Sequence, residues 1–163
     1  MRYFRVMLDH VNVYAHPAQR AATALTLETS NNELARTVVY AVRIAAEQYL
    51  GHVHGITPER LHAFVQDHIV YDADLDPDLQ RIRMPWRTLL DEVTDCKSSA
   101  IFIGGLSLAQ GHQVAITFID EHGAGHWGHV YAVVDGIPCD PLLAYGQESS
   151  HRNSCTVFMD PIK

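Results

Sequence analysis

Cys96 stands at the polar start of a long apolar segment, "TDCKSSAIFIGGLSLAQG", which covers residues 94–111. A cysteine of a hydrophobic core is expected on an apolar face, whereas Cys96 follows an aspartate and precedes a lysine. If a helix begins at residue 96 or 97, the helix dipole and the unpaired N–H groups of its first turn would stabilise a thiolate. Cys96 is then either an activated nucleophile or a small, half-buried residue, and its position alone favours neither.

A nucleophilic thiol needs a general base, and the base needs a partner that orients it. His129 is the preferred base because it opens an expected strand, "HVYAVV", where a rigid backbone could hold it beside a helix start. Asp140, in "PCDP", begins the next element, and two antiparallel strands would place its carboxylate beside the imidazole. Each residue alone is more often a solvated histidine or a turn aspartate. Asp135 is the next candidate for the orienting role.

Helices are expected to dominate the first part of the chain. Ser30 and Glu33 resemble a capping box, and Thr57 followed by Pro58 is a typical N-cap and first helical position. The acidic, proline-bearing residues 72–85 are expected to form a loop. The expected helices cover residues 33–51, 58–71 and 86–93.

The apolar segment after Cys96 is expected to be a buried helix over residues 98–110, because it is apolar on nearly every side. Gly104 and Gly105 predict that another part of the chain packs very close there, and Gly111 is a natural end. The expected strands cover residues 2–8, 23–29, 112–120, 129–136 and 154–160. Helices followed by antiparallel strands predict an α+β fold.

Length and composition predict one globular domain over residues 1–163. Twelve basic and nineteen acidic residues give a net charge of −7, which disfavours nucleic acid as a partner. The three cysteines form no CxxC pair and indicate a reducing compartment. No signal peptide and no membrane-spanning segment is recognised, so a cytoplasmic location is expected.

Several histidines invite a metal hypothesis, because residues 52–54 and 122–129 are rich in them. None of these groups has a recurring zinc spacing, so neither a metal nor an organic cofactor is expected. Trp127 lies in a glycine-flanked segment two residues before His129, where it could line a substrate site or act as a hydrophobic plug. Cys139 and Cys155 are interpreted as small hydrophobic residues.

The order of these motifs resembles the transglutaminase-like cysteine peptidase superfamily, in particular its small bacterial or phage members. The resemblance covers roughly residues 60–143: "DC" with its buried helix, a strand, "HVYAVV" and then "DP". The preceding segment, "FVQDHIVYDADLDPDLQRIRMPWRTLLDEVTDC", is similar to the family's helix, Tyr-Asp loop and short lead-in helix. The sequence departs from the family at Thr94, where glycine is common, at residues 97–99, and in "GIPCD", which lacks a tryptophan.

The resemblance implies a papain-like α+β core with Cys96 as nucleophile, His129 as base and Asp140 as its orienting partner. It implies cleavage of an amide in a peptide or protein substrate through a thioester. Transfer of the acyl group to an amine and a non-catalytic binding or structural role, possibly in a phage, remain alternatives. Trp86 is a candidate for the second oxyanion donor, although a tryptophan in the core is the more frequent case. The oligomeric state is left open.

Overall fold

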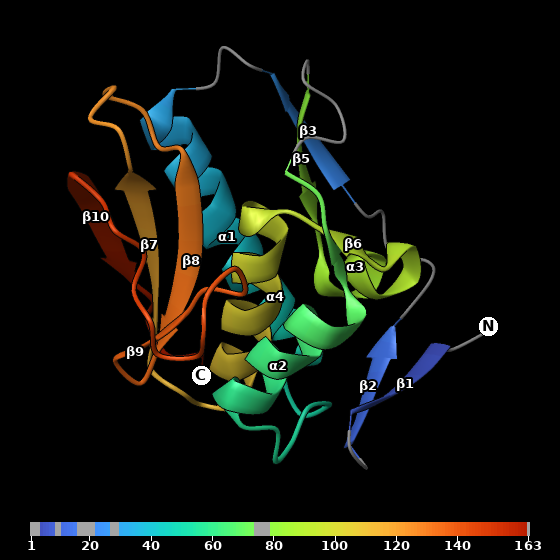
Figure 1. The fold of residues 1–163 in the computed structure, drawn as a ribbon. Coiled ribbons are helices and arrows are strands. Elements are labelled where there is room, and N and C mark those ends of the chain that lie inside the picture. The colour runs from blue at the N-terminus through green and yellow to red at the C-terminus, as the bar shows by residue number, and fades with distance from the viewer. Residues whose placement is uncertain (1–3, 9–10, 16–21, 27–29, 74–78, 163) are drawn as a thin grey trace.

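The computed structural model describes residues 4–8, 11–15, 22–26, 30–73 and 79–162 (Figure 1). The helices are α1 (Asn31–Tyr49), α2 (Pro58–His68), α3 (Pro85–Asp91) and α4 (Cys96–Ala109). The strands are β1 (Phe4–Leu8), β2 (Val11–Ala15), β3 (Ala22–Thr26), β4 (Val70–Tyr71), β5 (Leu79–Arg83), β6 (Val93–Thr94), β7 (Val114–Asp120), β8 (His129–Val134), β9 (Ile137–Cys139) and β10 (Asn153–Phe158). The predicted α+β class is confirmed.

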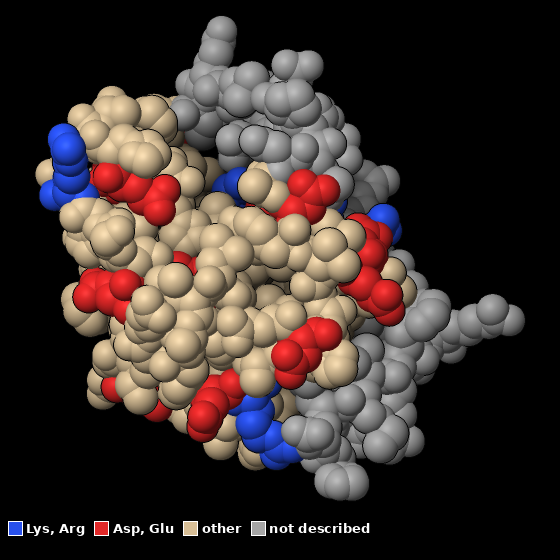
Figure 2. All heavy atoms as spheres, in the orientation of Figure 1, with Lys and Arg blue, Asp and Glu red and all other residues tan. Residues whose placement is uncertain are grey.

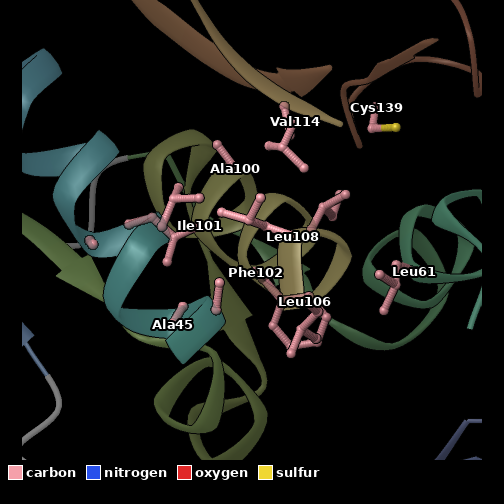
Figure 3. Close-up of a cluster of buried hydrophobic side chains, with 14 of the residues drawn as sticks. Ala45, Leu61, Ala100, Ile101, Phe102, Leu106, Leu108, Val114 and Cys139 are labelled. Atoms are coloured by element: carbon pink, nitrogen blue, oxygen red, sulfur yellow. The ribbon is translucent and has the colours of Figure 1, made fainter. Parts of the chain in front are cut away.

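Helix α4 is the centre of the molecule, with the large sheet on one side and α1, α2 and α3 around it (Figure 1). Every residue of α4 after Cys96 is buried, as its apolar composition predicted. Figure 3 shows side chains of α4 surrounded by Ala45 of α1, Leu61 of α2 and Val114 of β7. A helix that is covered on all sides holds its first residue in a rigid position, which matters for Cys96.

The predicted close approach at the glycine pair of α4 is confirmed. A Cβ atom at Gly105 would lie 2.6 Å from the Cβ of Ala45, so α1 and α4 touch almost backbone to backbone. A Cβ atom at Gly104 would lie 3.2 Å from Cδ1 of Ile116 on β7. The two glycines therefore let α4 fit between α1 and the sheet.

Local start signals set the ends of the first two helices. Ser30 accepts a hydrogen bond from the N–H of Glu33 while the carboxylate of Glu33 accepts one from the N–H of Ser30, which confirms the capping box. Thr57 caps α2 through the N–H of Arg60, and Pro58 occupies its first position. Helix α2 ends at His68, before the predicted end, and the chain continues as the short strand β4.

The main sheet is antiparallel with the strand order β10-β7-β8-β9. Asp135 and Gly136 form the tight turn between β8 and β9, with φ values of 51° and 80°. The pairing of Ala132 with Cys139 brings the residue after β9, Asp140, level with Tyr131, two residues after His129 and on the same face of β8. This hairpin is the element that places Asp140 beside His129.

One prediction for the middle of the chain was wrong. Residues 79–83, expected in a loop, form β5, which pairs antiparallel with β3. The pairing partner lies more than fifty residues away, so no local pattern marks the strand. Strands β2, β4, β6 and β9 were not predicted either. Residues 2–3 and 27–29 of the predicted strands, and residues 74–78 of the predicted loop, lie outside the described residues.

Among the described helices, none combines the length and apolar character that crossing a membrane requires.

Candidate active site

Cys96 is the first residue of α4, as predicted. Asp95 is the N-cap, and its Oδ1 accepts a hydrogen bond of 2.8 Å from the N–H of Ser98. The thiol of Cys96 is partly exposed, whereas the rest of the helix is buried. Cys96 therefore lies beside the unpaired N–H groups of the helix start and is accessible from solvent.

The structure brings His129 and Asp140 together. Nε2 of His129 donates a hydrogen bond of 2.7 Å to Oδ2 of Asp140, and both side chains are buried, 8% and 0% exposed. Because Nε2 carries the proton of this bond, Nδ1 is the nitrogen left for the third partner. Cys96 also lies close enough to the imidazole to raise the pKa of His129. The three residues form one chain of contacts: thiol, imidazole, carboxylate.

Opposing effects set the charge of this pair. Burial alone would lower the pKa of the His129 imidazole, but hydrogen bonds with Asp140 and Cys96 and the negative charges of both raise that pKa to about 10. Burial alone would raise the pKa of Asp140, but the hydrogen bond and charge of His129, with further bonds from Ser149 and Leu142, lower it. A positively charged imidazole beside the carboxylate of Asp140 is thus favoured at neutral pH.

Asp140 is held from several directions. Its Oδ2 also accepts a hydrogen bond of 2.7 Å from the hydroxyl of Ser149, and its Oδ1 accepts one of 3.0 Å from the N–H of Leu142. Nε2 of the buried His62 on α2 donates to the backbone carbonyl of Asp140 at 2.9 Å. Sequence reasoning missed both residues: His62 reaches Asp140 across 78 residues of the chain, and Ser149, nine residues after Asp140, belongs to no motif.

A pocket of about 310 Å³ opens beside the thiol. It is lined by Leu34, Tyr71, Ala73, Cys96, Lys97, Phe118, Val130 and the segment 126–129. The structure places Trp127 in this wall, as sequence analysis proposed. The lining combines apolar side chains, among them those of Phe118 and Val130, with the thiol of Cys96 and the imidazole of His129.

The segment that carries Trp127 is fixed at both ends. The amide side chain of Asn31, at the start of α1, accepts from the N–H of Trp127 at 3.1 Å and donates to the carbonyl of Gly125 at 2.9 Å. The carboxylate of Asp120, at the end of β7, accepts from the N–H groups of Ala124 and Gly125. Trp127 is therefore a defined wall of the pocket.

Trp86 is not among the residues that line this pocket. It belongs to α3 and lies in the hydrophobic core, 3% exposed, and its indole N–H has no hydrogen-bond partner among the described residues. The prediction that Trp86 binds substrate or an oxyanion is therefore wrong, because its side chain lies in the core and away from this pocket. Asp135 does not take the orienting role either, because it lies in the turn at the opposite end of β8 from His129. Its carboxylate contacts Nδ1 of His112 there at 2.7 Å.

Lys97, directly after Cys96, contributes an ammonium group to the pocket wall. Its Nζ lies 2.8 Å from Oδ2 of Asp95, and both side chains are about nine-tenths buried. One oxygen of the Asp95 carboxylate thus accepts from the helix backbone, and the other pairs with the ammonium group of Lys97. This ion pair keeps the net charge beside Cys96 close to neutral.

Within the described part of the chain, no group of three or more His, Cys, Asp or Glu side chains is arranged to hold a metal ion. On the face shown in Figure 2, acidic side chains are scattered among uncharged ones, and the visible Lys and Arg side chains lie apart from one another. A basic patch of the kind that binds a phosphate backbone is not seen on this face.

No protein-family model matches the chain, and neither the curated proteins nor the solved structures compared with it include a significant match.

Proposed function

We propose that this protein is a cysteine-dependent acyl-transfer enzyme, most simply a peptidase or amidase, with a papain-like core of the transglutaminase-like type. The observation that carries the proposal is the buried 2.7 Å contact between His129 and Asp140. The imidazole of His129 also lies next to Cys96, at the start of α4. A structural cysteine has no need of a buried imidazole and carboxylate in line with it. The three free cysteines also support a reducing, cytoplasmic setting.

In the proposed reaction, the thiolate of Cys96 attacks the carbonyl carbon of an amide. An S–C bond forms while the electron pair of the C=O double bond moves to oxygen, which the N–H of Cys96 can stabilise. The intermediate collapses, the C–N bond breaks, and the amine leaves with the proton that Nδ1 of His129 supplies. His129 then takes a proton from water, and the hydroxide attacks the thioester and releases the acid and Cys96.

Asp140 acts on the imidazole throughout these steps. Its hydrogen bond to Nε2 keeps Nδ1 turned to the reacting atoms, and its charge stabilises the imidazolium that is present before the amine leaves. Because Asp140 is itself held by Ser149, Leu142 and His62, the orientation is fixed before substrate binds.

Hydrolysis and transfer to an amine differ only in the acceptor of the acyl group. Peptide p-nitroanilides with varied acyl residues test the proposal, with and without a primary amine in the buffer. We expect release of p-nitroaniline by the wild-type chain and none by Cys96→Ala, and the acid or the amide as second product identifies the acceptor. Cys96→Ala should melt within a few degrees of wild type, because it removes only one partly exposed sulfur atom. A wild-type chain without turnover on amides and activated esters would favour a binding module.

A further inference from the structure

The proposed chemistry needs a second hydrogen-bond donor for the oxyanion, and Trp86 does not supply it, since it lies in the core. Tyr71 carries a neutral donor. It lines the same pocket as Cys96 and His129, and it lies close enough to Cys96 for the two side chains to interact. Its side chain is partly buried and forms part of the pocket wall, beside the space in which a carbonyl would be attacked.

The backbone fixes Tyr71 relative to Cys96. Strand β4 pairs in parallel with β6, and this pairing sets Tyr71 opposite Thr94, two residues before the nucleophile. The N–H groups of Val70 and Asp72 donate 2.8 Å hydrogen bonds to the carbonyls of Glu92 and Thr94. The hydrogen bonds between β4 and β6 therefore fix the position of Tyr71 relative to the start of α4.

The phenol is also kept in the form that can donate. Burial, the negative charges of Cys96 and Asp95 and the hydrogen bond to Cys96 all raise the pKa of Tyr71 above its ordinary value. The O–H group thus stays protonated over the pH range in which a thiolate exists. Lys97, another donor in the pocket wall, is already paired with Asp95.

We propose that Tyr71 is a catalytic residue whose hydroxyl, together with the backbone N–H of Cys96, binds the oxyanion formed when the thiolate attacks a carbonyl. This inference rests on the proposed acyl-transfer function. Before the attack, the hydroxyl donates to the thiolate. As the S–C bond forms, the negative charge moves from sulfur to the carbonyl oxygen. The hydroxyl of Tyr71 then donates its hydrogen bond to this oxygen in place of the sulfur. No proton is transferred from Tyr71 in this step.

Two reactions of the same thiol test the inference. Acylation by p-nitrophenyl acetate passes through an oxyanion, whereas alkylation by iodoacetamide displaces iodide from carbon and forms none. We expect Tyr71→Phe to slow acylation by about 100–1,000-fold, the usual loss for one oxyanion donor. Alkylation of Cys96 should change little, because a thiolate that loses a hydrogen bond is less populated but more nucleophilic. Tyr40→Phe, an exposed position on α1, is the matched control and should equal wild type in both reactions.

Tyr71→Gln, which restores a donor on a different side chain, should recover part of the acylation rate, and this variant distinguishes loss of the donor from loss of the fold. Equal losses of acylation and alkylation in Tyr71→Phe would overturn the inference, because Tyr71 would then act on the thiolate alone. Unchanged acylation in Tyr71→Phe beside an active wild type would also overturn it and leave the proposed function intact. Absence of acylation in wild type, with Cys96 still alkylated, would overturn the proposed function and this inference together.

Discussion

Nε2 of His129 and Oδ2 of Asp140 lie 2.7 Å apart in the interior of the protein, although one residue opens β8 and the other follows β9. The hairpin between these strands produces the contact, and Ser149 and His62 lock the aspartate from outside the hairpin. The contact leaves one imidazole nitrogen for Cys96. This relationship links the fold to the proposed chemistry.

Cys96 should be the most reactive of the three thiols. Cys139 is fully buried, and burial raises its pKa to about 12, so it should not react in the folded protein. Cys155 is exposed on β10, away from the start of α4, so it serves as the accessible reference thiol. We expect brief treatment with iodoacetamide at about pH 6 to label Cys96 first, as read from peptide masses. Faster labelling of Cys155 would show that Cys96 has no stabilised thiolate.

Asp140→Asn should change the pH dependence of acylation as well as its rate. The charge and hydrogen bond of Asp140 raise the pKa of His129, so a neutral amide should lower that pKa and deprotonate the imidazolium at a lower pH. The alkaline limb of the acylation profile should therefore move to lower pH. The maximal rate should fall by roughly 10–100-fold, because a hydrogen bond to a charged group is worth about 1.5–3 kcal/mol.

Asp135→Asn provides the control for that profile, because Asp135 faces His112 in an exposed turn. It should leave both the rate and the alkaline limb unchanged. If Asp140→Asn kept the wild-type limb while Asp135→Asn moved it, the orienting role would belong to Asp135.

The two glycines of α4 should respond differently to substitution by alanine. At Gly105 a Cβ atom would lie 2.6 Å from the Cβ of Ala45, so α1 must move, and overpacking of this kind costs about 1–3 kcal/mol. At Gly104 the nearest atom is the terminal Cδ1 of Ile116, which can turn aside, and alanine gains about 1 kcal/mol of helix propensity. Urea denaturation should show Gly105→Ala to be destabilised and Gly104→Ala to be close to wild type. The reverse order would mean that the helices pack differently.

The sequence allowed prediction of those features that depend on short-range signals. The start of α4 at Cys96, the capping box before α1 and the close approach at Gly105 each follow from a few neighbouring residues, and each is confirmed. Strand β5 escaped prediction because it forms only by pairing with β3, far away in the chain.

The same distinction holds for the candidate site. His129 and Asp140 belong to one hairpin and could be predicted to meet, and they do. Tyr71 and His62 reach the site from β4 and α2, so their roles depend on long-range packing that no motif records. The prediction for Trp86 was wrong because a tryptophan ten residues before Cys96 can equally face the core, and α3 turns it inward.

Formation of an acyl-enzyme at Cys96 tests the central claim most directly. The wild-type chain is mixed with p-nitrophenyl acetate, quenched in acid and digested, and the peptide masses show where acetyl groups are bound. We expect one acetyl group on the peptide that contains Cys96, released by hydroxylamine, and far slower labelling of that peptide in His129→Ala. Acetylation of Cys96 at the same rate in wild type and His129→Ala, or no acetylation of Cys96 in either, would contradict the account.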